Sequence, residues 1–152
     1  MAANWYERTL LPYLLDWACS GKPMRRQRVQ VKLIGLSAER LPVDDASFET
    51  VVCTYTLCTI ADPIAALKEM RRALAPGGRL LFSEHGRAPD ENVLKWQTRL
   101  QPYWKKLSGG CTLDRDIPAL LEQAGFRPNF QSRYIPGPKI LSYHYWGEAV
   151  AM

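Results

Sequence analysis

Residues 62–85 read DPIAALKEMRRALAPGGRLLFSEH and contain the signals of a helix, a turn and a strand in succession. Asp62 followed by Pro63 is typical of a helix start, with an acidic N-cap and proline in the first turn. Pro76 and Gly77 predict where the helix stops. The apolar centre of residues 79–85 then predicts a strand that ends in Glu84 and His85.

A second strand precedes this unit. Residues 48–57, FETVVCTYTL, have an unbroken apolar centre, which is typical of a strand covered on both faces. Strand, helix and strand joined by short connections predict two parallel strands with a right-handed crossover. We expect five residues of these strands to be the buried centre of the sheet: Val51, Val52, Leu80, Leu81 and Phe82.

The second half of the chain predicts two helices and two more strands. One helix follows Asp90 and is interrupted at Pro102, and a shorter one begins at Asp114 or Asp116. Strands are expected over 130–135 and 140–150, on either side of the turn PGPK. These elements predict an α/β, three-layer domain closed by an antiparallel hairpin.

The first 36 residues predict one helix, a basic turn and one strand. Residues 3–19 carry an apolar stripe at helical spacing, and residues 21–28, GKPMRRQR, form a basic turn. Residues 29–34 alternate apolar and polar, as a strand with one wet face does. The length of 152 residues predicts a single domain, with an N-terminal helix and basic turn over 1–28 and an α/β core over 29–152.

Composition limits the partners. The net charge is +5, but the basic residues cluster only in 21–28, so we expect a solvated turn there rather than an anion-binding patch, and no nucleic-acid partner. No apolar run is long enough for a membrane span and no secretory signal is recognisable, which predicts a cytoplasmic protein without a membrane partner.

The four cysteines lack CxxC spacing, so we expect free thiols and no metal, although Cys53, Cys58, Cys111 and His85 are conceivable ligands.

Two segments resemble a known family. Residues 37–85 contain LP, DASFETVV, ADPIAALKEMRRALAPGGRL and SEH in the order found in the second half of small-molecule class I S-adenosylmethionine (SAM)-dependent methyltransferases. Residues 96–126, WQTRLQPYWKKLSGGCTLDRDIPALLEQAGF, are similar to methyltransferase-like thiol methyltransferases. Together the resemblance covers residues 37–146 and implies a Rossmann-like sheet, SAM as cofactor and a small-molecule acceptor, for which a thiol is one candidate.

The resemblance also implies a site at the carboxyl ends of the strands, where open α/β sheets bind ligands. It assigns SAM contacts to Ser37, Ala38, Glu39, Thr54, Tyr55, Thr56 and Cys58. It places Glu84 and His85 at the acceptor as catalytic candidates, His85 being suited to general-base work near neutral pH. The alternative is that His85 only caps the strand end or bonds Glu84. Trp96, Trp104 and Cys111 are candidate acceptor-binding residues, the two tryptophans being equally compatible with a helix core.

One part of the family pattern is missing. The sequence contains no GxG, and there is no room between the basic turn 21–28 and LIGLSAE for the two strands and two helices that carry the family's Gly-rich turn and ribose-binding acid. The N-terminal helix leads directly to a segment that resembles the family's third strand. The chain therefore resembles a truncated methyltransferase, in which strand 48–57 has an unpaired edge. We expect strand 29–34 to occupy that edge, or a homodimer to cover it. The alternative function is an inactive methyltransferase remnant that serves as a binding or oligomeric module.

Overall fold

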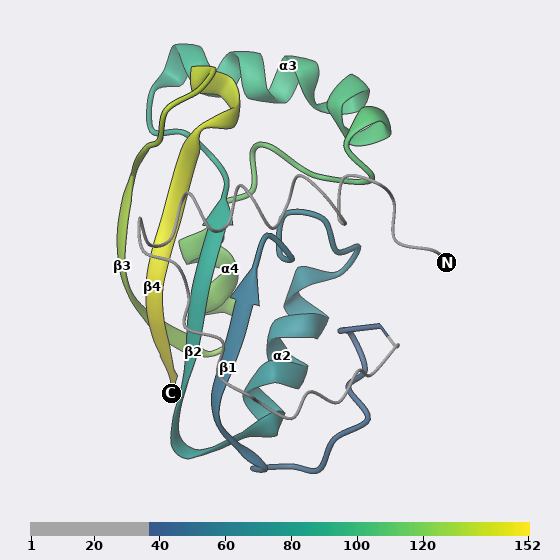
Figure 1. The fold of residues 1–152 in the computed structure, drawn as a ribbon, viewed down its shortest axis with the longest axis vertical. Coiled ribbons are helices and arrows are strands. Elements are labelled where there is room, and N and C mark those ends of the chain that lie inside the picture. Colours follow the sequence, from purple (N-terminus) through teal and green to yellow (C-terminus); the bar gives the residue numbers. More distant parts are fainter. Residues whose placement is uncertain (1–36) are drawn as a thin grey trace, which may run out of the picture. The chain divides into compact units, whose positions relative to one another are not determined.

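A computed structural model describes residues 37–152. The chain divides into two compact units, residues 1–33 and 34–152, and the elements described here belong to the second. The predicted helix 3–19, basic turn 21–28 and strand 29–34 lie outside the described residues, and the single-domain prediction stays a prediction. The elements in chain order are β1 (Phe48–Thr54), α2 (Pro63–Ala73), β2 (Leu74–His85), α3 (Glu91–Leu107), α4 (Ile117–Gln123), β3 (Phe126–Tyr134), the 3-10 turn η1 (Lys139–Leu141) and β4 (Tyr143–Ala151) (Figure 1).

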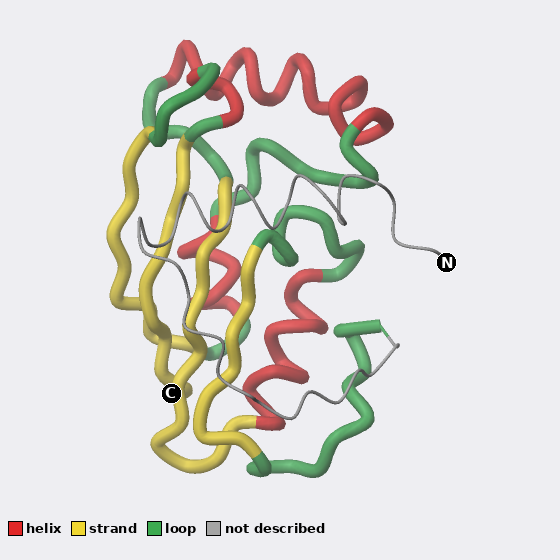
Figure 2. The backbone as a smooth tube through the Cα atoms, viewed as in Figure 1, coloured by secondary structure: helices red, strands yellow, loops and turns green. Residues whose placement is uncertain are grey.

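The four strands form one open sheet in the order β1-β2-β4-β3. β1 and β2 are parallel, and β4 runs antiparallel to both β2 and β3 (Figure 2). The predicted α/β class, the parallel pair and the closing antiparallel hairpin are confirmed. The hairpin does not simply extend the sheet, because its second strand lies between β2 and β3.

Helix α2 begins as its sequence predicts. The Asp62 carboxylate accepts a hydrogen bond from the Ala65 N–H at 2.9 Å, and Pro63 occupies the first turn. The helix ends at Ala73, and β2 begins at once with Leu74, so Pro76 and Gly77 lie inside the strand rather than in a separate turn. Gly77 has a φ of +80°, a conformation that favours glycine and bends the strand where its register with β1 shifts.

The core lies on one face of the sheet, against α2 and α4. Leu80 and Phe82 of β2 are 0% and 3% exposed, and they pack with Leu67 of α2 and Leu121 of α4. The prediction that Val52 is buried is wrong, since its side chain is 66% exposed. Successive strand residues point to opposite faces, and the helices described here cover only the face of Cys53 and Phe82. Residues 37–152 therefore provide two of the three predicted layers.

Helix α3 is continuous through Pro102, where the sequence predicted an interruption. Gln97 and Gln101 lie one turn apart in the part of the helix before Pro102, and both make side-chain hydrogen bonds to residues outside the helix. The buried Gln97 side chain accepts from the Ala88 N–H at 2.9 Å and donates to Gly86 and Ile140 carbonyls at 3.1 Å each. These bonds dock α3 across the end of the sheet where β1 and β2 finish (Figure 1).

The remaining bounds differ modestly from the predictions. Helix α4 uses Asp116, not Asp114, as its N-cap, with the carboxylate accepting from Ala119 at 3.1 Å. Strand β3 starts four residues before the predicted 130, directly after Gly125 (φ +84°). Strand β4 starts at Tyr143 because residues 139–141 form η1. Within residues 37–152, no helix has the length and apolar character that a bilayer span requires.

Candidate functional site

The carboxyl ends of β1 and β2 lie side by side, and the loop after β1 turns sharply there. Tyr55 has a φ of +47°, which is unusual for a residue with a side chain and is found most often at binding sites and tight turns. Its N–H donates to the Ser83 carbonyl at 3.0 Å, so the turn is tied to β2. This bend carries Thr56, Leu57 and Cys58 back over the end of the sheet.

Glu84, near the end of β2, binds the backbone of the loop formed by residues 56–58. Its side chain is fully buried and its carboxylate accepts from the N–H groups of Thr56 (2.7 Å), Leu57 (3.1 Å) and Cys58 (3.3 Å). The Cys53 thiol adds a longer contact at 3.6 Å. Burial raises the pKa of Glu84, and the three N–H donors oppose that rise by favouring the charged form. The geometry makes Glu84 a positioning residue for the 56–58 loop.

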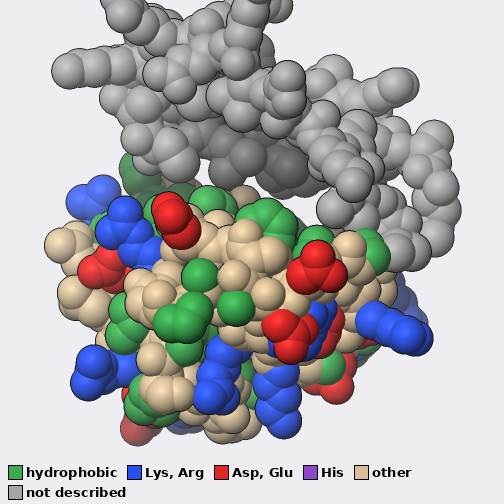
Figure 3. Space-filling model, turned by 90° about the horizontal axis from the view of Figure 1, so that it is seen from below, with side chains coloured by type: hydrophobic (Ala, Val, Ile, Leu, Met, Phe, Trp, Pro, Cys, Tyr) green, Lys and Arg blue, Asp and Glu red, His purple; other side chains and the backbone are tan. Residues whose placement is uncertain are grey.

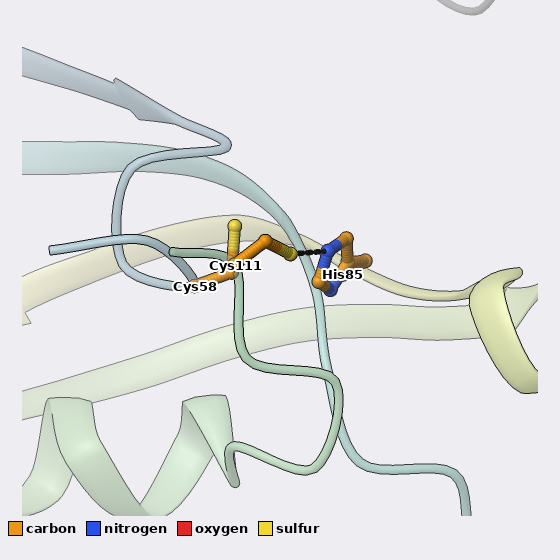
Figure 4. Close-up of side chains that lie close together, drawn as sticks. All are labelled: Cys58, His85 and Cys111. Carbon is orange, nitrogen blue, oxygen red and sulfur yellow. Dashed lines mark hydrogen bonds between the residues drawn. The ribbon is translucent and has the colours of Figure 1, made fainter. Parts of the chain in front are cut away.

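His85 follows Glu84 in sequence but points to the other face, because strand side chains alternate. Its Nε2 lies 2.8 Å from the Cys111 Sγ, and the Cys58 Sγ completes a group of three atoms that lie within 4.8 Å of one another (Figure 4). Cys58 and Cys111 are buried, while His85 is partly exposed. The predicted pair Glu84 and His85 is therefore divided between two tasks, and His85 is grouped with two thiols instead.

Cys111 reaches this cluster through loop-to-loop hydrogen bonds. The Thr112 N–H donates to the Cys58 carbonyl at 2.7 Å, and the Arg115 guanidinium donates to the Leu57 carbonyl. From the other side, the Gln101 amide donates to the Cys111 carbonyl at 3.1 Å and accepts from the Leu113 N–H at 2.6 Å. The loop after β1 and the loop after α3, more than 50 residues apart in sequence, are therefore joined by hydrogen bonds.

The thiols differ in acidity. The hydrogen bond from Cys58 lowers the pKa of Cys111 to about 7, against the opposing effect of burial. The same interaction, followed by burial, raises the pKa of Cys58 well above its usual range. For His85, burial lowers the pKa, but the hydrogen bond with Cys58 and the negative charges of Cys58 and Glu84 outweigh it, so the net pKa is raised. The cluster thus favours a thiolate on Cys111 beside a basic imidazole.

Two ring neighbours of His85 were not predicted as a group. The Tyr55 ring lies edge-on to His85 (6.3 Å between centroids) and to His144 (5.6 Å), and the two imidazoles are 6.1 Å apart. His144 pairs with His85 across β2 and β4, and burial lowers its pKa. Sequence reasoning missed His144 because nothing in the sequence gives the register of an antiparallel strand 60 residues away. The two histidines are the only ones in the chain.

The predicted acceptor residues separate in the structure. Trp104 is close to Cys111, and together with Ser108 it helps to lower the pKa of that thiol. Trp96 is 54% exposed and lies under the Arg99 guanidinium at 5.6 Å. Of the predicted acceptor residues, the structure therefore brings Trp104 and Cys111 to the cluster, but not Trp96.

The predicted adenine loop is tied to helix α2. The Ser37 hydroxyl donates to the Glu39 carboxylate at 3.1 Å, and the other Glu39 oxygen accepts from the Asp62 N–H at 2.9 Å. Ala38 is partly buried against the core. Residues 37–39 and 54–58 thus lie on the two loops that flank the carboxyl end of β1, the side of the sheet that a SAM site would use.

The fit of these residues to SAM is incomplete. The N–H groups of residues 56–58 point to Glu84 and the Glu39 carboxylate binds Asp62, so these polar groups are already satisfied. Thr54 is exposed, and the Thr56 hydroxyl donates to its carbonyl at 3.0 Å. The described residues supply the two loops that the resemblance assigns to the adenine and the acceptor, but the sequence contains no Gly-rich turn of the kind that would receive the methionine end.

The opposite end of the sheet has a different character. Seen from that end, the described surface mixes acidic and basic side chains with small apolar areas, and no histidine is visible (Figure 3). In the last turn of α2, the Arg72 guanidinium donates hydrogen bonds to Glu69, Asp45 and the carbonyls of Leu41 and Val43. This end is held together by ion pairs, and the thiols and imidazoles lie at the other.

Comparisons with known proteins agree with this arrangement. A family model described as a methyltransferase domain matches residues 10–82. Thiol S-methyltransferase TMT1B of Homo sapiens is 39% identical over 109 residues, which cover 70% of this chain and 45% of that protein. Thiol S-methyltransferase TMT1A of Homo sapiens is 36% identical over 112 residues, 71% of this chain and 46% of that protein. The chain spans less than half the length of these two relatives.

Solved structures share the fold. A SAM-dependent methyltransferase of Thermotoga maritima, described as a possible histamine N-methyltransferase, superposes with a TM-score of 0.56 and 21% identity, over 76% of this chain and 61% of that one. At this identity the likeness concerns the fold alone. The family model, the relatives and the shared sheet together establish that the chain belongs to the class I S-adenosylmethionine-dependent methyltransferase family.

Proposed function

We propose that this protein acts in SAM-dependent methyl transfer to a small-molecule thiol. The observation that carries the proposal is the similarity to thiol S-methyltransferases over 109 and 112 residues. The cluster of Cys58, His85 and Cys111 offers a base beside the ends of β1 and β2. SAM, when bound, supplies an electrophilic methyl group. A thiol acceptor must lose its proton to become a good nucleophile, and a positioned base can remove it.

His85 is the proposed proton acceptor. It is partly exposed at the carboxyl end of β2, and its pKa is raised, so it can take a proton near neutral pH. Trp104 and Tyr55 would provide apolar surface beside it for the acceptor. Glu84 keeps loop 56–58 in place rather than exchanging protons with the substrate.

The test is calorimetric titration with SAM and with its demethylated product, followed by mass spectrometry of a small alkyl thiol incubated with protein and SAM. Without the Gly-rich turn we expect a dissociation constant for SAM on the order of 0.1 mM or weaker. We expect methylated thiol to form, and His85→Gln to reduce its formation by about 10²-fold or more. Lys68→Gln, on the exposed side of α2, is the matched control and should leave the rate unchanged.

The outcomes separate the alternatives. Absence of SAM binding at millimolar concentration would contradict the proposal and favour the inactive binding module. Binding without thiol methylation would show that the acceptor belongs to another class. Micromolar binding by a monomer would show that residues other than the family's glycines form the SAM site.

A further inference from the structure

The cluster of Cys58, His85 and Cys111 has the composition of a metal site. Two thiol sulfurs and one imidazole nitrogen converge within 4.8 Å from three separate segments: the loop after β1, the end of β2 and the loop after α3. Two sulfurs and one nitrogen are donors that zinc prefers over magnesium or calcium. No CxxC spacing marks this site, because the ligands are separated by 27 and 26 residues and meet only in the folded sheet.

We propose that Cys58 Sγ, Cys111 Sγ and His85 Nε2 bind one zinc ion and leave its fourth position open for an exogenous thiolate. Three protein ligands with an open position are typical of catalytic zinc, whereas structural zinc has four. Naming a thiol as the fourth ligand rests on the proposed function; the three-ligand site does not depend on it. In the zinc-loaded protein the metal would ionise the acceptor thiol, and His85 would act as a proton acceptor only in metal-free protein.

The geometry is compatible with a tetrahedral ion. Zn–S and Zn–N bonds of ordinary length place two sulfurs about 3.8 Å apart, and a sulfur and a nitrogen about 3.6 Å apart. The His85 Nε2 and Cys111 Sγ are 2.8 Å apart, so the imidazole and thiol need to separate by less than 1 Å to admit the ion between them.

The surroundings hold the ligands as metal sites generally require. Cys58 is fixed on both sides, since its N–H donates to Glu84 and its carbonyl accepts from Thr112. The Cys111 carbonyl accepts from Gln101 of α3. Gly86, directly after His85, fits so closely that a Cβ there would lie 2.5 Å from the Arg115 carbonyl oxygen. The strand end that carries His85 is therefore fixed against the loop that follows Cys111.

The charge balance also suits a buried ion. Two thiolates and a neutral imidazole compensate the two charges of zinc, so little net charge is buried by the three-ligand site. Cys58 is 2% and Cys111 8% exposed, while His85 is partly exposed, so the accessible side of the cluster is that of His85. A thiol entering there would bind zinc through sulfur as its S–H bond breaks, with the proton released to solvent and the zinc-bound water displaced.

The binding test uses zinc alone and cobalt(II) as a spectroscopic probe, on the full chain without SAM. We expect one zinc per chain in competition with a chromophoric chelator. Cobalt should give the intense visible bands of tetrahedral coordination and a thiolate-to-cobalt band in the near ultraviolet. Zinc should protect Cys111 from alkylation by iodoacetamide, as measured by peptide mass spectrometry.

Variants assign the ligands. Cys58→Ser, Cys111→Ser and His85→Gln should each weaken zinc binding by more than about 100-fold, the upper range for loss of a supporting residue. The matched controls Cys53→Ser and His144→Gln remove one thiol and one imidazole from positions beside the cluster and should retain stoichiometric zinc. Absence of the tetrahedral cobalt spectrum, or binding that survives the three ligand variants, would overturn the proposal. So would loss of binding in the two controls alone.

The fourth position is tested separately. Adding 2-mercaptoethanol to the cobalt-loaded protein should strengthen the thiolate band, and an unchanged spectrum would overturn the assignment of a thiol ligand. Removing zinc with a chelator should abolish thiol methylation if zinc ionises the acceptor. Methylation that persists in chelated protein would overturn the zinc role while leaving the proposed function, with His85 as the base, intact.

Discussion

The two faces of the sheet differ in how they are used. On one face, Leu80, Phe82 and Glu84 alternate with the outward residues of β2 and are all buried under α2 and α4 or the loop after β1. On the other, Val52 is largely exposed, while His85 and His144 gather at one end with Tyr55. The face that stabilises the fold and the face that carries the imidazoles are separated by a single step along the strand.

The largest effect should come from the buried face. Leu80→Ala removes a side chain with no exposed surface from the middle of the core, and we expect it to lower the free energy of unfolding by about 2–5 kcal/mol. Val52→Ala, on the neighbouring strand but facing outward, should change it by less than about 1 kcal/mol. Urea denaturation of both variants measures the contrast. Equal losses would show that something covers Val52 and that the faces do not differ.

Glu84 and His85 offer the next contrast, between adjacent residues. Glu84→Gln keeps one oxygen that can accept from Thr56 and Leu57, but it turns an amide N–H₂ toward the N–H of Cys58 and removes that acceptor, which should cost about 1–3 kcal/mol of stability at pH 7. His85→Gln should leave stability almost unchanged while altering zinc binding. Thermal melts and chelator competition distinguish the two. If Glu84→Gln were as stable as the parent, the carboxylate would not be what holds loop 56–58.

Glu84 also sets a pH dependence. Because its folded pKa is raised, the folded chain binds a proton more tightly than the unfolded chain does, and this contribution to stability is present below the ordinary Glu pKa. It is lost as the pH rises through the folded pKa. We expect stability measured from pH 4 upward to fall more in the parent than in Glu84→Gln. A parallel course of the two curves would contradict the raised pKa.

The cysteines of the cluster should differ in their reactivity toward alkylating reagents. In metal-free protein, the pKa of about 7 for Cys111 predicts that its alkylation rate rises with pH with a midpoint near 7, since only the thiolate reacts. Cys58, whose pKa is raised, should stay unreactive over the same range. Peptide mass spectrometry after iodoacetamide treatment resolves the two cysteines. A midpoint near 9 for Cys111 would mean that Cys58 does not stabilise its thiolate.

The smallest effect concerns the edge at β1. Within residues 37–152 this strand pairs only with β2, so half of its N–H groups face away from the described sheet. We expect residues 29–34 or a second copy of the chain to cover that edge, and therefore slow hydrogen exchange across residues 49–54. Protection that weakens on dilution would indicate the homodimer. Exchange as fast as in residues 42–46 would contradict both forms of cover.

Local signals explain how much could be predicted. Asp62-Pro63, the apolar centre of 79–85 and the PGPK turn each act within a few residues, and they predicted α2, β2 and the closing hairpin correctly. The failures are non-local. Nothing in the sequence near Val52 reveals which face of β1 is covered. The sequence near Pro102 also does not show that α3 is anchored by hydrogen bonds from Gln97 to residues 86, 88 and 140. Likewise, His85, Cys58 and Cys111 were each singled out, but only tertiary contacts join them.

The position of β4 has a consequence for how the chain acquires its structure. This strand, Tyr143–Ala151, is synthesised after the other three described strands, yet it lies between β2 and β3 and pairs with both along nearly its whole length. During translation, β2 therefore keeps one open edge for more than 50 residues of growth, and β3 has no partner in the sheet until its neighbour emerges. Such late, long-range pairing slows folding and exposes strand edges to other chains. The step that completes the sheet is thus also the one during which a nascent chain is most vulnerable to aggregation.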